Sequence, residues 1–583
     1  MTAAPAEHGA TRPPGPVLEL DRLSIATPDR TLVHDCTLSV AAGEAVGLVG
    51  ESGSGKTLSV RAVAGLLPAH FSTGGEIRIL GQDIAAMPAR ELRELRSRRL
   101  GMVFQTPRAH LNPLRTIGDF LTEALVTVAG VSRSAALARA ADLLDEVGIP
   151  DPARRLRQFP AELSGGLLQR VMIAATLAMD PEILLADEIT TALDVTTQEE
   201  VMAVIGDLRR HRELSLLFIT HDLALAGAVC DRVAVMREGR IVETLHAATM
   251  RQDAREAYTR VLMSAALDAA PVVDPGDAAA AAPAASGSAA GPAPVLTVSG
   301  LRKTFRVRSA HGGGRETLVA VDNVDLELHA GGSLGIVGES GSGKSTTARI
   351  ICGLEHADAG TVTVEGADWS RPARGGAERR TRAKTMQMVF QDPYQSLDRR
   401  QTVRQCLAEA VRVHRRSDPP EAVASRIAEL AKQVHLDPAL LDARPRGLSG
   451  GQRQRVAIAR ALAADPRILV LDEAVSALDV TTQVEILTLL DGIRRDTGVA
   501  LLMITHDLTV IRRLCDHVVV MRSGAIEESG PSEQILDDPQ AEYTRVLLDS
   551  IPREGWRPRR RRPSRTAAIP TVTQIHTIPD LEE

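Results

Sequence analysis

The 583-residue sequence contains few aromatic residues and few cysteines. Aromatic side chains make up 2% of the chain, and no stretch carries a pocket signature for a particular small molecule. Five cysteines are scattered without a CxxC pair or a Cys-His cluster at the spacing of a zinc site: Cys36, Cys230, Cys352, Cys406 and Cys515. We interpret them as buried, reduced thiols rather than metal ligands.

Long hydrophobic runs are also absent. No stretch reaches the about 20 apolar residues that a membrane-spanning helix needs, and the richest ones, at residues 214–219 and 499–504, fit buried strands. Residues 1–16 lack a basic start followed by an apolar block, so they do not resemble a secretory signal. We expect a cytosolic chain that does not span a bilayer, with residues 1–16 as a disordered tail.

A strong charge bias is missing, since the formal net charge is −6. This charge gives no general attraction to nucleic acid, so no nucleic-acid partner is expected. Residues 556–583 are rich in arginine and proline and are predicted to form a basic, disordered tail. The arginine run at 559–562 is interpreted as solvated, with contact to anionic lipid headgroups or a partner as the alternative.

The chain contains an internal duplication. The string GESGSGK stands at residues 50–56 and again at 338–344, and other motifs recur at nearly the same separation. Because the chain is longer than one hydrophobic core usually organises, we predict two domains, at residues 17–264 and 295–555. Residues 265–294 consist almost wholly of Ala, Pro, Gly, Ser, Val and Asp, which predicts a flexible linker.

Each copy has the same order of predicted elements. A β-rich start is followed by a strand, a glycine-rich loop and a helix. A helical middle comes next, with helices expected at residues 89–99 and 132–147 of the first copy, and short apolar strands then alternate with helices. This order predicts the α/β fold class with a helical insertion in each domain.

The glycine-rich loops match the phosphate-binding pattern G-x-x-x-x-G-K-[ST] between an apolar strand and a helix. Glycine lets the backbone N–H groups and the helix N-terminus face phosphate. Lys56 and Lys344 are expected to neutralise the β- and γ-phosphates, while Thr57 and Ser345 offer hydroxyl groups to Mg²⁺. A single match could be an incidental glycine turn, but two in the same context argue against that.

Two acidic pairs end buried apolar runs, Asp187 with Glu188 and Asp472 with Glu473. In each pair the aspartate suits water-mediated contact with Mg²⁺, and the glutamate is placed to polarise an attacking water as a general base. The alternative is a strand end whose acids simply face solvent.

A Leu-Ser-Gly-Gly sequence precedes a long apolar helix in both copies. A serine and two glycines at a helix start expose backbone N–H groups and the positive end of the helix dipole to an anion. Either sequence alone could be an ordinary N-cap, but both stand at the same distance before an acidic pair.

Together these motifs resemble the ATP-binding cassette (ABC) family over nearly all of both copies. The resemblance implies two tandem P-loop NTPase domains, each with a β-rich N-terminal subdomain and a helical signature subdomain. In that family the glycine loop of one domain and the serine-glycine signature of the other enclose one ATP. This implies that Lys56 pairs with Ser449 and Lys344 with Ser164.

The same resemblance assigns four more residues. Gln105 and Gln391 match the family's Q-loop, which senses Mg²⁺ and the attacking water and touches the transmembrane partner; His221 and His506 match its switch histidine. A lone histidine there would more often be structural, but two in register with the other motifs favour the functional role. The implied cofactors are ATP and Mg²⁺.

The candidate residues fall into three sets. The implied catalytic residues are Glu188, Glu473, His221, His506, Gln105 and Gln391. The implied nucleotide contacts are Gly50, Glu51, Ser52, Gly53, Ser54, Gly55, Lys56, Thr57, Gly338, Glu339, Ser340, Gly341, Ser342, Gly343, Lys344, Ser345, Thr346, Phe305, Ser164, Gly165, Gly166, Ser449, Gly450, Gly451 and Gln452. The implied metal contacts are Thr57, Ser345, Gln105, Gln391, Asp187 and Asp472.

The two copies depart from the family pattern at different places. Family members stack adenine on an aromatic residue after the first strand; Phe305 fits that place, whereas residues 24–27 of the first copy contain no aromatic residue. This predicts weaker nucleotide binding at the Lys56 site. The first signature continues with Leu167 and Leu168 where the second has polar residues, which we expect to alter the helix surface more than the chemistry.

The Q-loop sequences and the Tyr-Thr-Arg motif near each domain end resemble the oligopeptide, dipeptide and nickel importer branch of the family. The resemblance implies an ATP-hydrolysing motor at the cytoplasmic face of the plasma membrane. Its implied partners are two transmembrane permease subunits and an extracytoplasmic substrate-binding protein. Peptide is the expected cargo, with glutathione or a nickel or other metal chelate as alternatives. The rival function is a soluble tandem ABC ATPase acting on ribosomes or nucleic acid.

Overall fold

The structure is a computed structural model that describes residues 15–190, 193–267, 293–308, 315–476, 478–553 and 555–560. Most of the predicted N-terminal tail, linker and C-terminal tail lies outside these residues. The first domain ends in a helix that continues to Leu267, past the expected limit at 264, and the second begins with a strand at Pro294.

The first domain contains a four-stranded antiparallel sheet of order β2-β1-β4-β5 and a six-stranded, mostly parallel sheet of order β10-β9-β3-β8-β7-β6. Its strands are β1 (Leu18–Ala26), β2 (Thr31–Val40), β3 (Ala45–Val49), β4 (Ser72–Ile79), β5 (Gln82–Asp83), β6 (Leu100–Val103), β7 (Ile183–Asp187), β8 (Ser215–Thr220), β9 (Arg232–Arg237) and β10 (Arg240–His246). Its helices are α1 (Lys56–Val63), α2 (Ala89–Arg98), α3 (Pro107–His110), α4 (Ile117–Thr127), α5 (Arg133–Glu146), α6 (Pro152–Arg155), α7 (Gly165–Thr176), α8 (Val195–Arg212), α9 (Leu223–Val229), α10 (Met250–Asp253) and α11 (Ala257–Leu267), with the 3-10 turns η1 (Pro160–Glu162), η2 (Leu177–Met179) and η3 (Ala247–Thr249).

The second domain repeats this architecture, with sheets of order β12-β11-β14-β15 and β16-β17-β18-β13-β19-β20. Its strands are β11 (Pro294–Arg308), β12 (Arg315–His329), β13 (Ser333–Val337), β14 (Ala359–Val364), β15 (Ala367–Asp368), β16 (Met386–Val389), β17 (Ile468–Asp472), β18 (Ala500–Ile504), β19 (His517–Arg522) and β20 (Ala525–Pro531). Its helices are α12 (Lys344–Ile351), α13 (Gly376–Thr385), α14 (Pro393–Ser396), α15 (Val403–His414), α16 (Pro420–Gln433), α17 (Gly450–Leu462), α18 (Val480–Thr497), α19 (Leu508–Leu514), α20 (Ser532–Asp537) and α21 (Glu542–Asp549), with η4 (Pro438–Asp442) and η5 (Pro445–Gly447). The predicted α/β class with a helical insertion is confirmed.

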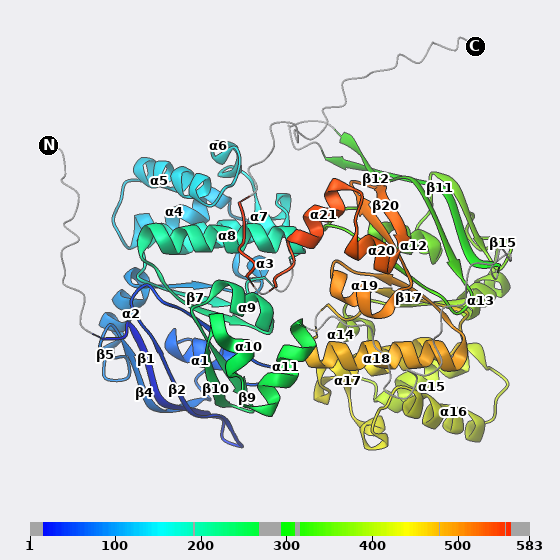
Figure 1. Ribbon diagram of the computed structural model, residues 1–583, viewed down its shortest axis with the longest axis horizontal. Helices are drawn as coiled ribbons and strands as arrows, with labels where there is room; N and C mark the ends of the chain where they lie inside the picture. Colours follow the sequence, from blue (N-terminus) through cyan, green and yellow to red (C-terminus); the bar gives the residue numbers. More distant parts are fainter. Residues whose placement is uncertain are drawn as a thin grey trace, which may run out of the picture.

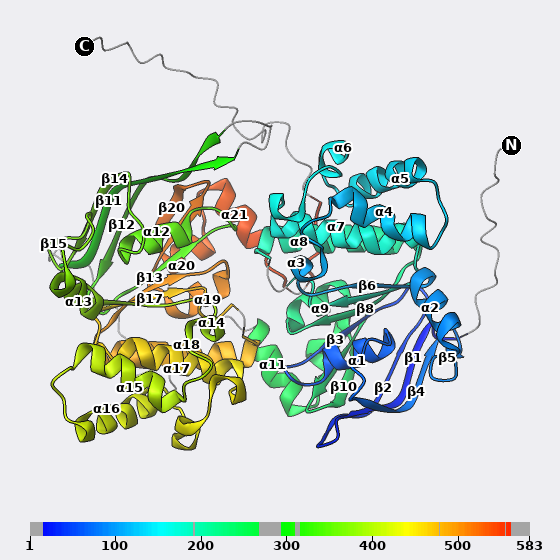
Figure 2. The same cartoon turned by 180° about the vertical axis from the view of Figure 1, so that it is seen from behind.

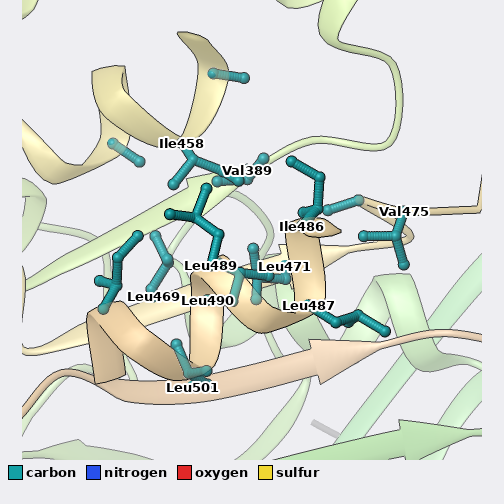
Figure 3. Packing of buried hydrophobic residues seen from close by; sticks show 14 of the residues in the cluster. Val389, Ile458, Leu469, Leu471, Val475, Ile486, Leu487, Leu489, Leu490 and Leu501 are labelled. Atoms are coloured by element: carbon teal, nitrogen blue, oxygen red, sulfur yellow. The ribbon is translucent and has the colours of Figure 1, made fainter. Parts of the chain in front are cut away.

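The six-stranded sheet carries the core of each domain. Every residue of β3, β7 and β8 is buried, as expected of parallel strands covered by helices on both faces. Figure 3 shows the corresponding layer of the second domain, where the leucines of α18 gather beside Leu469 and Leu471 of β17. Buried residues on α18 recur every three or four positions, which gives the helix one apolar face toward the sheet.

The two domains lie side by side, and the last helix of each domain contacts the other domain (Figure 1). Helix α11 of the first domain lies against α18 of the second, and α21 of the second lies against α8 of the first. The view from behind shows the same two contacts (Figure 2). Arg513 adds a hydrogen bond of 2.8 Å to the carbonyl oxygen of Ala265.

The described residues beyond α21, 550–553 and 555–560, which we call the C-terminal strap, lie on the first domain. Trp556 is 6% exposed and belongs to the hydrophobic core of that domain. The Ser550 hydroxyl and the Arg559 N–H both donate to the carboxylate of Glu199 on α8, at 3.0 and 3.3 Å. Arg560 pairs with Asp207 at 3.2 Å.

This packing differs from the expectation that the disordered tail begins at residue 556. Composition cannot reveal that another domain supplies the apolar surface on which Trp556 packs. Residues 561–583 lie outside the described part of the chain.

The described residues also bear on membrane-spanning helices and on the cysteines. Among the helices of the described residues, none combines the length and apolar character that crossing a bilayer requires. All five cysteines are free thiols; four of them are buried, whereas Cys352, which was also expected to be buried, is partly exposed.

Candidate functional site

In each domain the glycine-rich loop joins a buried strand to a helix that begins at the loop's lysine. The first glycine of the loop leaves no room for a side chain. A Cβ added to Gly50 would lie 2.0 Å from the carbonyl oxygen of Met236, and at Gly338 the corresponding distance to Met521 is 2.1 Å. The loop can therefore turn over the edge of the sheet only with glycine at this place.

The loop lysines are buried cations held by the loop itself. The Lys56 ammonium donates to the carbonyl oxygens of Gly50 and Glu51, at 2.7 Å each. Lys344 does the same in its own loop, at 2.8 and 2.7 Å. Burial lowers the pKa of both lysines, and nearby acidic side chains oppose the shift. Each loop thus encloses a positive charge beside a helix N-terminus, an arrangement suited to phosphate.

Each loop also meets the aspartate at the end of the neighbouring strand. The Thr57 hydroxyl donates to Asp187 at 3.0 Å, and the Ser345 hydroxyl donates to Asp472 at 3.0 Å. Burial raises the pKa of both carboxyls, although these hydrogen bonds act in the opposite direction.

This hydroxyl and carboxylate fit Mg²⁺ in the way that nucleotide sites use it. No group of three or more His, Cys, Asp or Glu side chains able to hold a metal occurs among the described residues. Mg²⁺ is commonly held by one or two protein oxygens, with phosphates and water completing its shell. The two oxygens at each site meet that requirement.

The second acid of each pair adopts an unusual backbone conformation. Glu188 and Glu473 both have a φ of 47°, in the left-handed region that non-glycine residues rarely occupy. Each carboxylate accepts a hydrogen bond of 2.6 Å from a glutamine of the predicted Q-loop, Gln105 in the first domain and Gln391 in the second. Strain of this kind is typical of functional sites.

The two histidines differ in their contacts. His506 Nδ1 lies 3.4 Å from a carboxylate oxygen of Glu473. Burial alone would lower the pKa of His506, but the hydrogen bond and negative charge of Glu473 outweigh it and raise that pKa. Within the described residues, no corresponding bond joins His221 to Glu188.

The signature sequences cap the helices that follow them. The Ser164 hydroxyl accepts the N–H of Leu167 at 3.4 Å, and the Ser449 hydroxyl accepts the N–H of Gln452 at 3.2 Å. Gln452 also accepts the N–H of Ser449 at 2.9 Å, which completes a capping box. Leu167 cannot make this second bond, so the two signature helices begin differently.

The second glycine of each signature packs on the following long helix. A Cβ on Gly166 would lie 2.3 Å from the methyl group of Thr197 on α8, and one on Gly451 would lie 2.4 Å from that of Thr482 on α18. Ser164 and Ser449 remain exposed. Each signature is therefore fixed to the start of a helix that reaches the other domain.

Three hydrogen bonds connect those helix starts to the opposite glycine-rich loops. The Thr196 hydroxyl donates to Glu339 at 2.8 Å, and the N–H of Ser340 donates to Asp194 at 3.3 Å. In the reverse direction, the Thr481 hydroxyl donates to Glu51 at 2.9 Å. The glycine-rich loop of each domain thus faces the other domain, as the resemblance implied.

Sequence reasoning gave no role to the helix-start partners in these bonds, Asp194, Thr196 and Thr481. Asp194 and Asp479 are recognisable as N-caps of α8 and α18, and their recurrence in both copies was the available signal. Burial would raise the pKa of Asp194, but hydrogen bonds from Thr197, Thr196 and Ser340 outweigh it and lower that pKa. The N-cap pattern does not indicate which of these partners belongs to another domain.

The Tyr-Thr-Arg motif near each domain end contacts the glycine-rich loop of its own domain. The Tyr258 hydroxyl accepts the N–H of Glu51, and the Tyr543 hydroxyl accepts the N–H of Glu339, both at 3.2 Å. Burial raises the pKa of Tyr258 to about 12. This motif thus supports the loop, a role that the sequence did not indicate.

The first domain has Thr27, a residue without a ring, at the place of Phe305. Strand β1 ends at Ala26, and the N–H of Thr27 already donates to the carbonyl oxygen of Arg30 in a turn at 2.9 Å. In the second domain the equivalent hairpin continues, and Phe305 pairs with Leu318 as a half-buried residue. The first hairpin thus turns at the place where the second still pairs and carries its aromatic residue.

Two glycine-rich loops with buried lysines, each bonded to the start of α8 or α18 in the other domain, define a tandem P-loop ATPase. The chain matches the family described as "ABC transporter" over residues 33–191 and 321–476, and it belongs to that family. Residues 528–577 also match the family described as "Oligopeptide/dipeptide transporter, C-terminal region".

Curated relatives are similar over nearly their whole length. The peptidoglycan transport ATP-binding protein YejF of Agrobacterium fabrum is 39% identical over 549 residues, which cover 91% of this chain and 96% of the relative. The oligopeptide transport ATP-binding protein OppD of Mycobacterium tuberculosis is 38% identical, and the match covers 90% of this chain and 95% of the relative. The glutathione import ATP-binding protein GsiA of Escherichia coli O157:H7 is 38% identical, and the match covers 94% of this chain and 92% of the relative.

Proposed function

We propose that this chain is the motor subunit of an ABC importer for peptides and works at the cytoplasmic face of the plasma membrane. Two permease subunits form the pore, and an extracytoplasmic binding protein delivers the cargo. The relatives named for oligopeptide, peptidoglycan and glutathione transport support this proposal over a soluble ATPase that acts on ribosomes or nucleic acid. The match of residues 528–577 to an oligopeptide/dipeptide transporter region favours peptide over a metal chelate.

The observation that carries the proposal is the pair of reciprocal contacts between glycine-rich loops and opposite helix starts. In the proposed mechanism, ATP lies between Lys344 and the Ser164 signature, and between Lys56 and the Ser449 signature. Because each nucleotide touches both domains, its binding draws them together. The paired hydroxyl and aspartate of each site would hold Mg²⁺, which would neutralise phosphate charge.

Hydrolysis then depends on the strained glutamates. Glu188 and Glu473 each accept a proton from the attacking water, and Gln105 and Gln391 orient that water because they already bond these carboxylates. His221 and His506 contact the γ-phosphate. Loss of that phosphate releases the contact between domains, and the Q-loop passes the movement to the permeases.

The test is the ATPase activity of the purified full chain, with and without a candidate permease pair in liposomes. Glu188→Gln and Glu473→Gln are compared singly and together, with the exposed Glu91→Gln as the matched control. Removal of a general base lowers the rate by about 10²- to 10⁴-fold, so the double variant should be nearly inactive while the control keeps the wild-type rate.

Stimulation of the wild type by the permeases supports the importer motor. Full activity that permeases leave unchanged but ribosomes or nucleic acid increase would reject it. A transport assay with labelled peptide, glutathione and nickel chelate in the same liposomes tests the cargo. Uptake of the chelate without peptide would contradict the peptide assignment.

A further inference from the structure

A groove beside the Q-loop of the second domain gathers four arginines. It is lined by Leu397, Asp398, Arg399, Arg400, Arg444 and Arg446, which come from the loop after α14 and from the start of η5. All four arginines are exposed, and none forms an ion pair with another described residue. The one carboxylate of the groove, on Asp398, is occupied as acceptor of the Arg400 N–H at 2.9 Å.

The groove carries a net positive charge. Four guanidinium groups face a single carboxylate, and salt screens the charge of exposed groups only in part. Arg399 is further fixed in place because its guanidinium lies 4.2 Å from the ring centroid of Tyr394. A fixed, unpaired positive groove is complementary to an acidic segment.

The first domain has no such cluster at the equivalent place. The two loops can be matched bond by bond: the N–H of Leu114 donates to Asn112 at 3.0 Å, as that of Arg400 does to Asp398. Pro113, Leu114, Phe159 and Ala161 therefore stand where the four arginines stand in the second domain. Leu114 is 85% exposed and Phe159 is 42% exposed, so this face is apolar.

The groove is connected to the ATPase site by a short stretch of chain. Gln391, whose amide bonds Glu473 at 2.6 Å, directly precedes the segment of α14 that leads to Arg399. Arg460 of the signature helix α17 also bonds the carbonyl oxygen of Ser396 in that segment. A partner held in the groove thus acts on both the Q-loop and the signature helix.

We infer that this arginine groove docks an acidic segment of one permease subunit, and that the apolar face of the first domain does not accept the same segment. The inference rests on the proposed importer function and adds that the two permease subunits are chemically different at their contacts. The tandem chain then binds them in one orientation only. An anionic lipid surface is the less favoured partner, because a membrane would face both domains alike and the first domain has no arginine at the four matching positions.

The first test measures binding of a synthetic glutamate-rich helical peptide to the full chain by fluorescence anisotropy. A peptide of the same sequence with glutamine in place of each glutamate serves as the probe control. The variants are Arg399→Gln/Arg400→Gln/Arg444→Gln/Arg446→Gln, the same four positions changed to lysine, and Leu114→Gln/Phe159→Gln in the first domain. All of these side chains are exposed, so the fold should be retained.

We expect the acidic peptide to bind the wild type more weakly as salt increases, and to lose at least about tenfold in affinity in the glutamine variant. The lysine variant should retain most of the affinity, and the first-domain variant all of it. Equal binding to the wild type and the glutamine variant would overturn the inference. Loss of flotation with phosphatidylglycerol vesicles in the glutamine variant, with peptide binding unchanged, would also overturn it and assign the groove to lipid.

The second test repeats the ATPase assay with permeases. The glutamine variant should keep the basal rate and lose the stimulation that the wild type shows. If the wild type is stimulated and the variant is stimulated equally, the docking inference fails while the importer function stands. If permeases do not stimulate the wild type, the proposed function itself fails, and the docking inference fails with it.

Discussion

At the scale of single residues, the two nucleotide sites differ most at the position of Phe305. The first hairpin has Thr27, a turn residue without a ring, at the corresponding place. The second site also has the bond between His506 and Glu473, which the first site lacks among the described residues. Both differences favour the Lys344 site.

We therefore predict that nucleotide binds more weakly at the Lys56 site. Stacking of a base on an aromatic ring contributes roughly 1–3 kcal/mol, or about 5- to 150-fold in affinity. Titration of Lys344→Ala, which leaves only the Lys56 site, should give the weaker binding, and Lys56→Ala the tighter. Phe305→Ala should remove most of the difference; equal affinities of the two lysine variants would contradict the prediction.

At this scale the sequence predicted which residues form the sites better than it predicted contacts between residues far apart in the chain. The buried lysines, the hydroxyl-aspartate pairs and the glutamine-glutamate pairs all involve residues named from their motifs. These motifs are local, and their strand–loop–helix context fixes where each side chain lies. Tyr258 was noticed only as part of a domain-end motif, because its bond to Glu51 joins residues far apart in the chain.

At the scale of elements, the starts of α8 and α18 combine two roles. Asp194 caps α8 by accepting the N–H of Thr197 at 2.9 Å, and it also accepts the N–H of Ser340 from the other domain. Asp479 caps α18 through Thr482 at 3.0 Å. Of these two aspartates, only Asp194 accepts a backbone N–H from the other domain among the described residues.

This asymmetry predicts different effects of Asp194→Ala and Asp479→Ala. Loss of an N-cap costs about 1 kcal/mol, so both variants should speed amide exchange in the first turn of their own helix. Only Asp194→Ala should also speed exchange in the loop around Ser340, by up to about tenfold. Hydrogen exchange with mass spectrometry measures both regions. Asp194→Asn, which keeps an acceptor oxygen, is the control; equal exchange around Ser340 in it and in Asp194→Ala would refute the role of the bond.

The elements themselves were largely predictable. The helix expected at 89–99 is α2, that at 132–147 is α5, and the apolar strands before the loops and acids are β3, β7, β13 and β17. Apolar residues recur regularly in these segments, and glycines stand near their ends. Hairpin lengths were not predictable, because the turn at Thr27 and the continuation of β11 depend on pairing rather than composition.

At the scale of the whole molecule, the domains are joined by more than the chain between them. Helix α11 lies on α18, α21 lies on α8, and the C-terminal strap places Trp556 in the core of the first domain. None of these contacts has a local sequence signal, since each depends on how two folded domains meet.

The strap predicts that the two domains remain together when the linker is cut. With a protease site engineered within residues 268–292, the halves of the wild type should co-elute in gel filtration after cleavage. Trp556→Ala removes a buried aromatic side chain, a change that costs about 3–5 kcal/mol in a core, so its halves should separate more readily. Arg557→Ala is the control, since this neighbour is outside the core cluster. Dissociation of the cleaved wild type would refute the prediction.

Helix α11 packs on α18, while α21 and the strap pack on α8, so the two domains are fastened to each other at two separate places. Domains fastened in this way cannot drift apart as two free bodies when nucleotide leaves. They can open only by turning about these two contacts, and the turn must break the bonds from the starts of α8 and α18 to the opposite glycine-rich loops. In the proposed importer, such a motor passes a rotation, not a separation, to its permeases.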